Sequence, residues 1–178
     1  MKITIADLDR SDFPVIRDWI DTDLFGVFHA PIGDDQLEVL LTRSRAGKLT
    51  DIGFKAVDDD TGEAIGLTHI VLDWTNELAH IQQMLVGRPE LRRRGTGSAM
   101  MRHALAVCFD RHGLHRVQLF TDEDNEAALS FYRKHGFHTD GFMREARKVN
   151  DRFVGWYCLS MLASEWSDLK GDEGPAEE

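Results

Sequence analysis

A strand, a helix and a second strand are predicted in direct succession between residues 78 and 121, and this succession most constrains the fold. "LAHIQQMLV", residues 78–86, alternates between two kinds of side chain as a strand does. A helix-periodic stretch follows, runs to about His112 and stops at Gly113, before the strand-like "HRVQLFT", residues 115–121. Two strands joined by one helix in this way lie parallel in the same sheet. The chain is therefore predicted to be an α/β protein.

The remaining segments predict further helices and antiparallel strands around this unit. Two strand-like runs flank the turn residues Asp59 to Gly62, and "FHTDGFMREARKV" and "RFVGWYCLSML" predict a late hairpin. The other predicted elements are a strand at 2–6 and helices at 11–20, 34–47 and 122–136. We expect one domain over residues 1–165 and an acidic, disordered tail over residues 166–178.

Composition and charge argue against several classes of protein. The 178 residues carry a net charge of −10, which argues against general nucleic-acid binding and mildly favours a cationic substrate. No apolar run approaches the ~20 residues of a membrane span, so we expect no membrane association. Cys108 and Cys158 lack metal-site or redox spacing, and the histidines lack metal-ligand spacing, so we expect a reduced, cytoplasmic protein without a metal.

The stretch "LRRRGTGSAM", residues 91–100, places three arginines and two glycines at the start of the predicted helix. A helix N-terminus presents unpaired N–H groups and a positive partial charge, and glycine lets a phosphate approach the backbone closely. Residues 92–98 therefore favour a phosphate or pyrophosphate site, with a solvated basic loop as the alternative. The dinucleotide motif G-x-G-x-x-G and the P-loop Lys-Ser/Thr are both missing here, which excludes those two kinds of nucleotide site.

Two motifs of the sequence match known signatures. "RRRGTG", residues 92–97, is similar to R/Q-x-x-G-x-G/A, and "NEAALSFYRKHGF", residues 125–137, is similar to N-x-x-A-x-x-x-Y-x-K/R-x-G-F. Together they resemble the motifs of the GNAT superfamily of N-acetyltransferases. The late hairpin looks like that of the branch that acetylates ribosomal-protein N-termini (RimJ/RimL-like), although Gly155 stands where that branch often has an aspartate. The resemblance implies a single-domain GNAT fold. This fold has a mixed, mostly antiparallel sheet of about seven strands flanked by helices, with its parallel central strands splayed around acyl-CoA.

The resemblance also implies a donor, acetyl-CoA, and the residues that bind it. The expected CoA-binding residues are Leu85, Val86 and Gly87 through their main chain, Arg92, Arg93, Arg94, Gly95, Thr96 and Gly97 around the pyrophosphate, and Asn125. Tyr132 is the expected general acid for the departing thiolate, and its alternative role is that of a buried aromatic residue.

His80 is the candidate general base, and the alternative is that His80 has only a structural role. His80, Gln82 and Met84 share one face of the predicted strand, and a histidine there suits proton transfer through water. His69 shares a strand face with apolar residues and is expected to be a core histidine.

The predicted reaction is direct acetyl transfer to a primary amine, either a protein N-terminus or a small cationic amine such as a polyamine or aminoglycoside. Asp21, Asp23, Asp34 and Asp35 flank the loop that often borders the acceptor in this family. A non-catalytic acyl-CoA-binding sensor is the alternative, and the oligomeric state stays open between a monomer and a homodimer.

Overall fold

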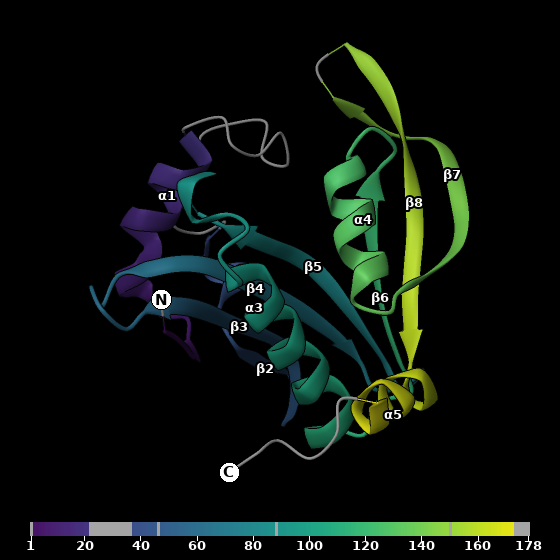
Figure 1. Cartoon of the computed structure of the whole chain (residues 1–178), viewed down its shortest axis with the longest axis horizontal. Helices are drawn as coiled ribbons and strands as arrows, with labels where there is room; N and C mark the ends of the chain where they lie inside the picture. Colours follow the sequence, from purple (N-terminus) through teal and green to yellow (C-terminus); the bar gives the residue numbers. More distant parts are fainter. Residues whose placement is uncertain (1, 22–36, 46, 88, 150, 173–178) are drawn as a thin grey trace. The chain divides into compact units, whose positions relative to one another are not determined.

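A computed structural model describes residues 2–21, 37–45, 47–87, 89–149 and 151–172 of the protein (Figure 1). Its strands are β1 (Ile3–Asp7), β2 (Arg43–Arg45), β3 (Lys48–Asp58), β4 (Ala64–Asp73), β5 (Leu78–Val86), β6 (Arg116–Asp122), β7 (His138–Val149) and β8 (Arg152–Leu162). Its α-helices are α1 (Phe13–Asp21), α3 (Thr96–Leu105), α4 (Glu126–Lys134) and α5 (Ala163–Asp172). Short 3-10 helices are η1 (Arg10–Asp12), η2 (Glu38–Leu40) and η3 (Pro89–Leu91), and a π-helical segment, η4 (Ala106–Arg111), follows α3.

The strands confirm a mixed, mostly antiparallel sheet. Their hydrogen-bonded order is β1-β3-β4-β5-β6-β8-β7, with β2 beside β3, so the described residues hold eight strands instead of about seven. The predicted parallel pair is present, because Leu78–His80 of β5 pairs in parallel with Arg116–Gln118 of β6. The chain divides into two compact units, one of Met1–Leu72 and Ile81–Ala104, the other of Asp73–His80 and Leu105–Glu178.

In the first unit, helices cover both faces of the strands β3 and β4. Leu67 of β4 packs with Ile16 and Trp19 of α1 in one buried apolar cluster. Gly66, which precedes Leu67, lies against the opposite face of the strand, because a Cβ placed on it would lie 2.8 Å from the sulfur of Met100 in α3. Since successive strand residues point to opposite faces, α1 and α3 contact opposite faces of β4.

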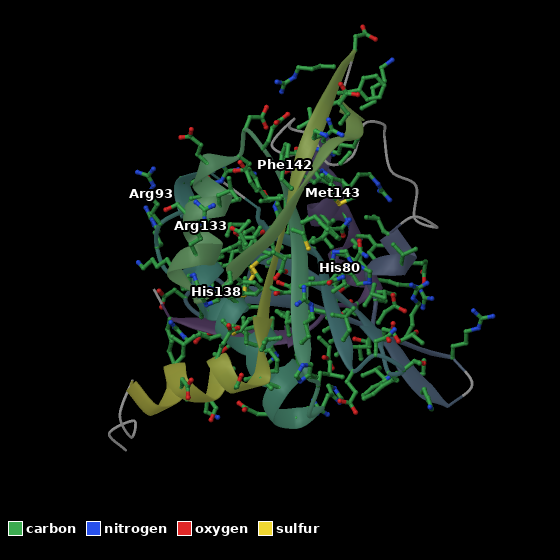
Figure 2. All side chains as sticks on the ribbon, turned by 90° about the vertical axis from the view of Figure 1, so that its right-hand side faces the viewer. His80, Arg93, Arg133, His138, Phe142 and Met143 are labelled. Carbon is green, nitrogen blue, oxygen red and sulfur yellow. The ribbon has the colours of Figure 1, made fainter. Side chains whose placement is uncertain are left out.

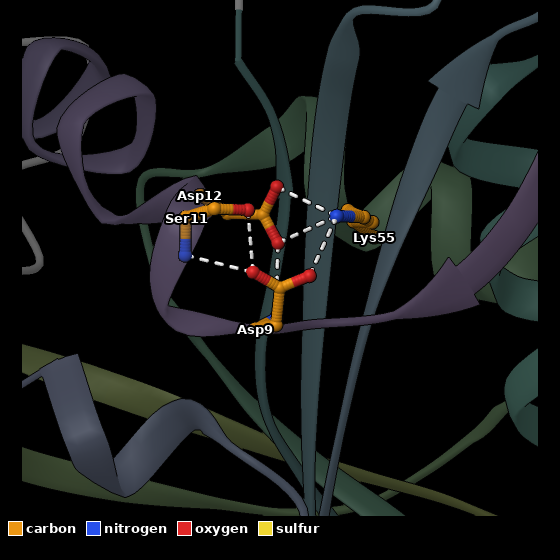
Figure 3. A network of polar contacts seen from close by, with 4 residues as sticks. All are labelled: Asp9, Ser11, Asp12 and Lys55. Atoms are coloured by element: carbon orange, nitrogen blue, oxygen red, sulfur yellow. Dashed lines mark hydrogen bonds and ion pairs between the residues drawn. The ribbon is translucent and has the colours of Figure 1, made fainter.

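The helix predicted over residues 11–20 is confirmed as α1, and the chain enters it through the 3-10 turn η1, which is capped by Asp9 (Figure 3). Asp9 accepts a hydrogen bond from the Ser11 N–H at 2.7 Å, and Asp12 accepts one from the Asp9 N–H at 3.0 Å. Lys55 of β3 donates to both oxygens of Asp12, at 2.7 and 2.8 Å. This carboxylate–lysine group therefore joins the start of the helix to the sheet, and the buried Asp12 has a cationic partner.

In the second unit, α4 lies alongside β6 and β8 (Figure 1). β8 pairs antiparallel with β6 on one side and with β7 on the other. α4 begins at Asn125, whose side chain accepts a hydrogen bond from the Ala128 N–H at 3.1 Å. The predicted helix at 122–136 is thus confirmed, with shorter ends, because an asparagine N-cap fixes where it begins.

The helix predicted over residues 34–47 is wrong for its described part. Leu37 and Leu40 are buried, as their spacing suggested, but only one 3-10 turn, η2, forms around them. Arg43–Arg45 then pair with β3 as the strand β2. Pairing with a strand that follows in the chain overrides the local i, i+3, i+4 spacing of the leucines.

The prediction of a disordered tail over residues 166–178 is wrong for residues 166–172, which are helical. Residues 163–172 form α5, in which the Trp166 indole donates to Asp110 at 3.0 Å and its ring stacks on Phe109 at 6.2 Å. Leu169 also packs against the backbone of Gly136. The residues that α5 contacts lie far from it in the sequence, so the acidic composition of the tail did not indicate these contacts. Residues 173–178 lie outside the described residues.

Candidate active site

The loop before α3 has a backbone conformation suited to an anion. Arg93 and Gly95 both adopt positive φ angles, 61° and 92°. The Ala99 N–H donates to the Gly95 oxygen at 2.9 Å, so the amides of Thr96 and Gly97 come before the first hydrogen bond of the helix. Left-handed residues next to a helix N-terminus turn backbone N–H groups toward a common point, which is how proteins bind phosphate groups.

Thr96 adds a second sign of a ligand at this helix end. Its side chain is 1% exposed, and its hydroxyl has no hydrogen-bond partner among the described residues. A buried hydroxyl without a partner costs free energy, so such groups usually have a function or an additional partner. A phosphate oxygen at the N-terminus of α3 would accept a hydrogen bond from this hydroxyl. The residues present therefore fit the pyrophosphate of CoA.

The three arginines of the loop are exposed. Arg93 extends away from the ribbon (Figure 2), and neither Arg93 nor Arg94 forms an ion pair with a described residue. In a chain with a net charge of −10, these guanidinium groups concentrate positive charge beside the helix end. The charge of the loop and its backbone conformation favour the same kind of ligand.

Part of the main chain at the end of β5, just before the loop, is already hydrogen-bonded within the sheet. The Gly87 N–H donates to the Ile65 oxygen at 2.9 Å, so this amide is unavailable to a ligand. A Cβ at Gly87 would lie 2.2 Å from Cε2 of Trp19, which explains the glycine by packing. Leu85 is buried and Val86 is half-buried at the end of β5. Main-chain contacts from Leu85 and Val86 to a pantetheine arm stay a prediction.

Tyr132 lies on α4 among other aromatic residues. Its ring is 5.5 Å from that of Phe131 and 6.0 Å from that of Phe137, measured between centroids. Burial raises the pKa of its hydroxyl to about 12. At neutral pH this hydroxyl is therefore protonated, which is the state that a general acid requires.

His80 lies at one end of an aromatic row that crosses three strands of the second unit. Its ring meets Phe120 of β6 edge-on at 5.1 Å, and Phe120 stacks on Trp156 of β8 at 5.5 Å. The predicted alternation along β5 is confirmed, because His80 is half-buried and Gln82 is exposed while Ala79 and Ile81 are buried. A polar, partly exposed strand face is compatible with water near His80.

An ion pair lies at the end of this row. The Asp122 carboxylate accepts hydrogen bonds from the Trp156 indole at 2.8 Å and from Arg147 Nε at 2.9 Å. Arg147 thus provides Asp122 with a cationic partner, and the Trp156 indole provides a second donor. The sequence analysis did not identify this group, because its members come from β6, β7 and β8.

His69 is a core histidine, as predicted, but it has a charged partner. Its Nε2 lies 3.2 Å from an Asp51 carboxylate oxygen that also accepts a 2.8 Å hydrogen bond from Arg43. Burial lowers the pKa of His69, with the Asp51 carboxylate opposing that shift. His69 is 5% exposed and Asp51 6%. This pair therefore has a structural role, joining β3 to β4.

The predicted site residues fall into two sets. Residues 85–87 and 92–97 belong to the first unit, whereas His80, Asn125 and Tyr132 belong to the second. Asn125 uses its side chain as the N-cap of α4. Asp23, Asp34 and Asp35 lie outside the described residues, as does the side chain of Asp21.

Within the described residues there is no group of three or more metal-binding side chains, and no helix has the length and apolar character needed to cross a membrane.

The structure also shows a groove that the sequence analysis missed. A cavity of about 530 Å³ lies between α4 and β8 in the second unit. Its lining residues are Glu123, Glu126, Leu129, Ser130, Arg133 and Tyr157. Glu126, Ser130 and Arg133 follow one another at i, i+4 and i+7, a spacing that could have indicated one common helix face.

Comparison with known proteins gives a consistent family match. The family described as Acetyltransferase (GNAT) family matches residues 13–137. The chain is 29% identical over 71 residues to the L-amino acid N-acetyltransferase AaaT of Escherichia coli (strain K12), covering 40% of this chain and 44% of that protein. It is 26% identical over 96 residues to the spermidine N(1)-acetyltransferase of the same strain, covering 52% and 49%. The chain thus matches less than half the length of these relatives.

A solved structure has a similar fold. The spermidine N-acetyltransferase from Vibrio cholerae, in complex with CoA and spermine, superimposes with a TM-score of 0.80 at 22% identity. The match covers 93% of this chain and 98% of that chain. At this identity the likeness establishes the fold alone.

Proposed function

Because the chain belongs to the acetyltransferase (GNAT) family, we propose that it transfers the acetyl group of acetyl-CoA to the nitrogen of a small primary amine. The family match covers the loop at 92–97 and the whole of α4. The relatives named above act on an amino acid and on spermidine, which supports a small amine as acceptor. The net charge of −10 supports a cationic one. A protein N-terminus is the competing acceptor.

The buried Thr96 hydroxyl is the observation that carries the donor assignment. It is a donor without a described acceptor at the N-terminus of a ten-residue helix, beside three exposed arginines. The CoA pyrophosphate would supply acceptor oxygens and negative charge to this hydroxyl and to the amides of Thr96 and Gly97. The thioester would supply an activated acetyl group.

The chemistry asks two things of the protein. The amine nitrogen forms a bond to the acetyl carbon while the carbon–sulfur bond breaks, so the amine must lose a proton and the sulfur must gain one. We assign the donation of the second proton to the Tyr132 hydroxyl, which is protonated at neutral pH. We assign the acceptance of the first proton to His80, reached through a water molecule, with bulk water or a carboxylate such as Asp34 or Asp35 as the alternative acceptor.

The test is an acetylation screen read by thiol release. Acetyl-CoA is offered with spermidine, free amino acids, an aminoglycoside and short peptides. Turnover with small amines above that with peptides supports the proposal, whereas acetylation of peptides alone would show that the acceptor is a protein N-terminus. CoA binding without turnover on any amine would make the chain a sensor and reject the enzyme assignment.

The donor site is tested separately by calorimetry. Gly97→Glu introduces a negative side chain at the helix N-terminus and should weaken CoA binding at least about tenfold. Gly171→Glu is the matched control, because a Cβ at Gly171 meets nothing within 4 Å and this glycine lies on α5. Unchanged CoA affinity in a folded Gly97→Glu variant would refute the site.

A further inference from the structure

Apolar side chains gather on the hairpin of β7 and β8. Among the described residues five large apolar side chains are exposed, and three of them are Phe142 (44%), Met143 (48%) and Phe153 (58%) of this hairpin. Figure 2 shows Phe142 and Met143 on β7, at the front of that view. Phe142 and Phe153 lie on one face of the hairpin, whereas Met143 points to the opposite face. Exposed apolar groups that lie together, unlike single ones, mark interaction sites.

The edge of β7 is unsuited to adding another strand. β7 is the last strand in the hydrogen-bonded order, but its pairing with β8 shifts between Thr139 and Gly141 and again between Met143 and Arg147. Glu145, inside the second irregularity, has a φ of 51°. Such bulges interrupt the row of edge hydrogen-bonding groups and protect a sheet against edge-to-edge pairing. The hairpin is therefore expected to bind through a face.

One face of the hairpin carries a row of three aromatic side chains. Phe153, Gly155 and Tyr157 alternate along β8 and so share a face. Phe142 pairs with Tyr157, with ring centroids 4.9 Å apart, and its ring fills the space above Gly155, because a Cβ there would lie 2.3 Å from Phe142 Cζ. The row thus runs from Phe153 through Phe142 to Tyr157. The glycine at 155 is what lets the middle ring lie flat on the strand.

The same face holds a groove at one end of the row and a projecting ring at the other. Tyr157 lines the cavity beside α4, together with Glu126 and Arg133. Phe153 lies four residues earlier in β8, about 13 Å away at the usual strand rise. Lys148 pairs with Phe153 across the hairpin, is exposed and forms an ion pair with Asp151 at 3.6 Å, so a cation lies beside the projecting ring. Two carboxylates, those of Glu123 and Glu126, and one cation, Arg133, line the groove.

We propose that two copies of the chain associate through this face, with a two-fold axis beside Gly155. Rotation about that axis exchanges residues 153 and 157, since each lies two residues from Gly155. Phe153 of each copy then enters the groove at Tyr157 of the other, and the two Phe142 rings meet near the axis. The same rotation brings Lys148 of one copy toward the acidic groove of the other. The interface is self-complementary in shape and in charge, as a two-fold dimer requires.

The oligomeric state tests the proposal. Sedimentation velocity on the full chain from 1 to 100 µM should show a dimer that dissociates only at low concentration. Phe153→Asp removes the projecting ring and should raise the dimer dissociation constant at least about 30-fold, as the loss of a central aromatic anchor does. Val39→Asp is the matched control, because Val39 is similarly exposed, at 41%, on η2, and this variant should dimerise like wild type.

Cross-linking tests the geometry independently. In a Cys158→Ser background, one tagged chain carries Asp151→Cys, which keeps the Phe153 ring, and a second carries Ser130→Cys. The mixture should form a cross-link between residues 151 and 130 through a short bifunctional maleimide. A wild-type chain that is monomeric at 100 µM, a Phe153→Asp variant that still dimerises as wild type does, or a mixture without the 151–130 cross-link would each overturn the proposal.

Discussion

Tyr132→Phe is the sharpest test of the proposed chemistry, because the structure separates the role of the hydroxyl from that of the ring. The variant removes one oxygen and keeps the ring that packs against Phe131 and Phe137. The Tyr132 hydroxyl makes no hydrogen bond with a described residue, so its removal should leave the free energy of unfolding within about 1 kcal/mol of wild type. A loss of general acid catalysis in full should lower kcat by about 100-fold, with CoA affinity unchanged.

The pH dependence gives the same hypothesis a second readout. Burial raises the pKa of the Tyr132 hydroxyl to about 12, so at pH 8 only about one molecule in ten thousand has lost this proton. The Tyr132 hydroxyl loses its proton, and so its ability to act as an acid, only when the pH rises toward 12. We therefore expect no alkaline decline in kcat from Tyr132 below about pH 10.

The assay is single-turnover thiol release at saturating acetyl-CoA, so that product release does not hide the chemical step. Tyr157→Phe is the matched control, since Tyr157 is the only other tyrosine of the chain and should retain wild-type kcat. If Tyr132→Phe retains wild-type kcat while chemistry limits the rate, water protonates the thiolate and the assignment of Tyr132 as the acid is refuted.

Three further predictions follow from the packing and charge of single residues. His80→Ala should remove the acid limb of the kcat/KM pH profile, and a profile that overlays wild type would leave bulk water or a carboxylate such as Asp34 or Asp35 as the base. Burial lowers the pKa of His69, so the unfolded chain binds more protons below pH ~6.5 and stability should fall as the pH drops through this window. His69→Gln should flatten that fall in urea midpoints measured from pH 5 to 7.5, and an unchanged slope would contradict the assignment. Gly87→Ala should cost about 1–3 kcal/mol in thermal or urea unfolding, because its Cβ would overlap the Trp19 ring, and a neutral change would show that the ring moves freely.

Local patterns were sufficient for most helices and strands. The alternation of residues 78–86 and 115–121, with a helix-periodic run between them, led to the parallel pair of β5 and β6. The helix predicted over residues 122–136 contains α4, although its beginning at the N-cap Asn125 was not predicted. The loop at 92–97 was predicted as an anion site from its glycines and the helix N-terminus, which act on their own neighbours. Each of these signals is contained within a few residues.

The features that the sequence left undecided join residues far apart in the chain. Arg43–Arg45 form β2 because β3 offers hydrogen-bonding partners, although the leucine spacing favours a helix. Trp166 orders the supposed tail through Asp110, 56 residues earlier, and His69 has Asp51 of the neighbouring strand as its partner. The groove at Tyr157 exists only where α4 lies beside β8. By itself, the sequence determined most of the helices and strands and the family resemblance, and it predicted an anion-binding loop. Tertiary packing decided which residues are buried together and which apolar side chains remain exposed, because burial depends on contacts that no short stretch of sequence contains.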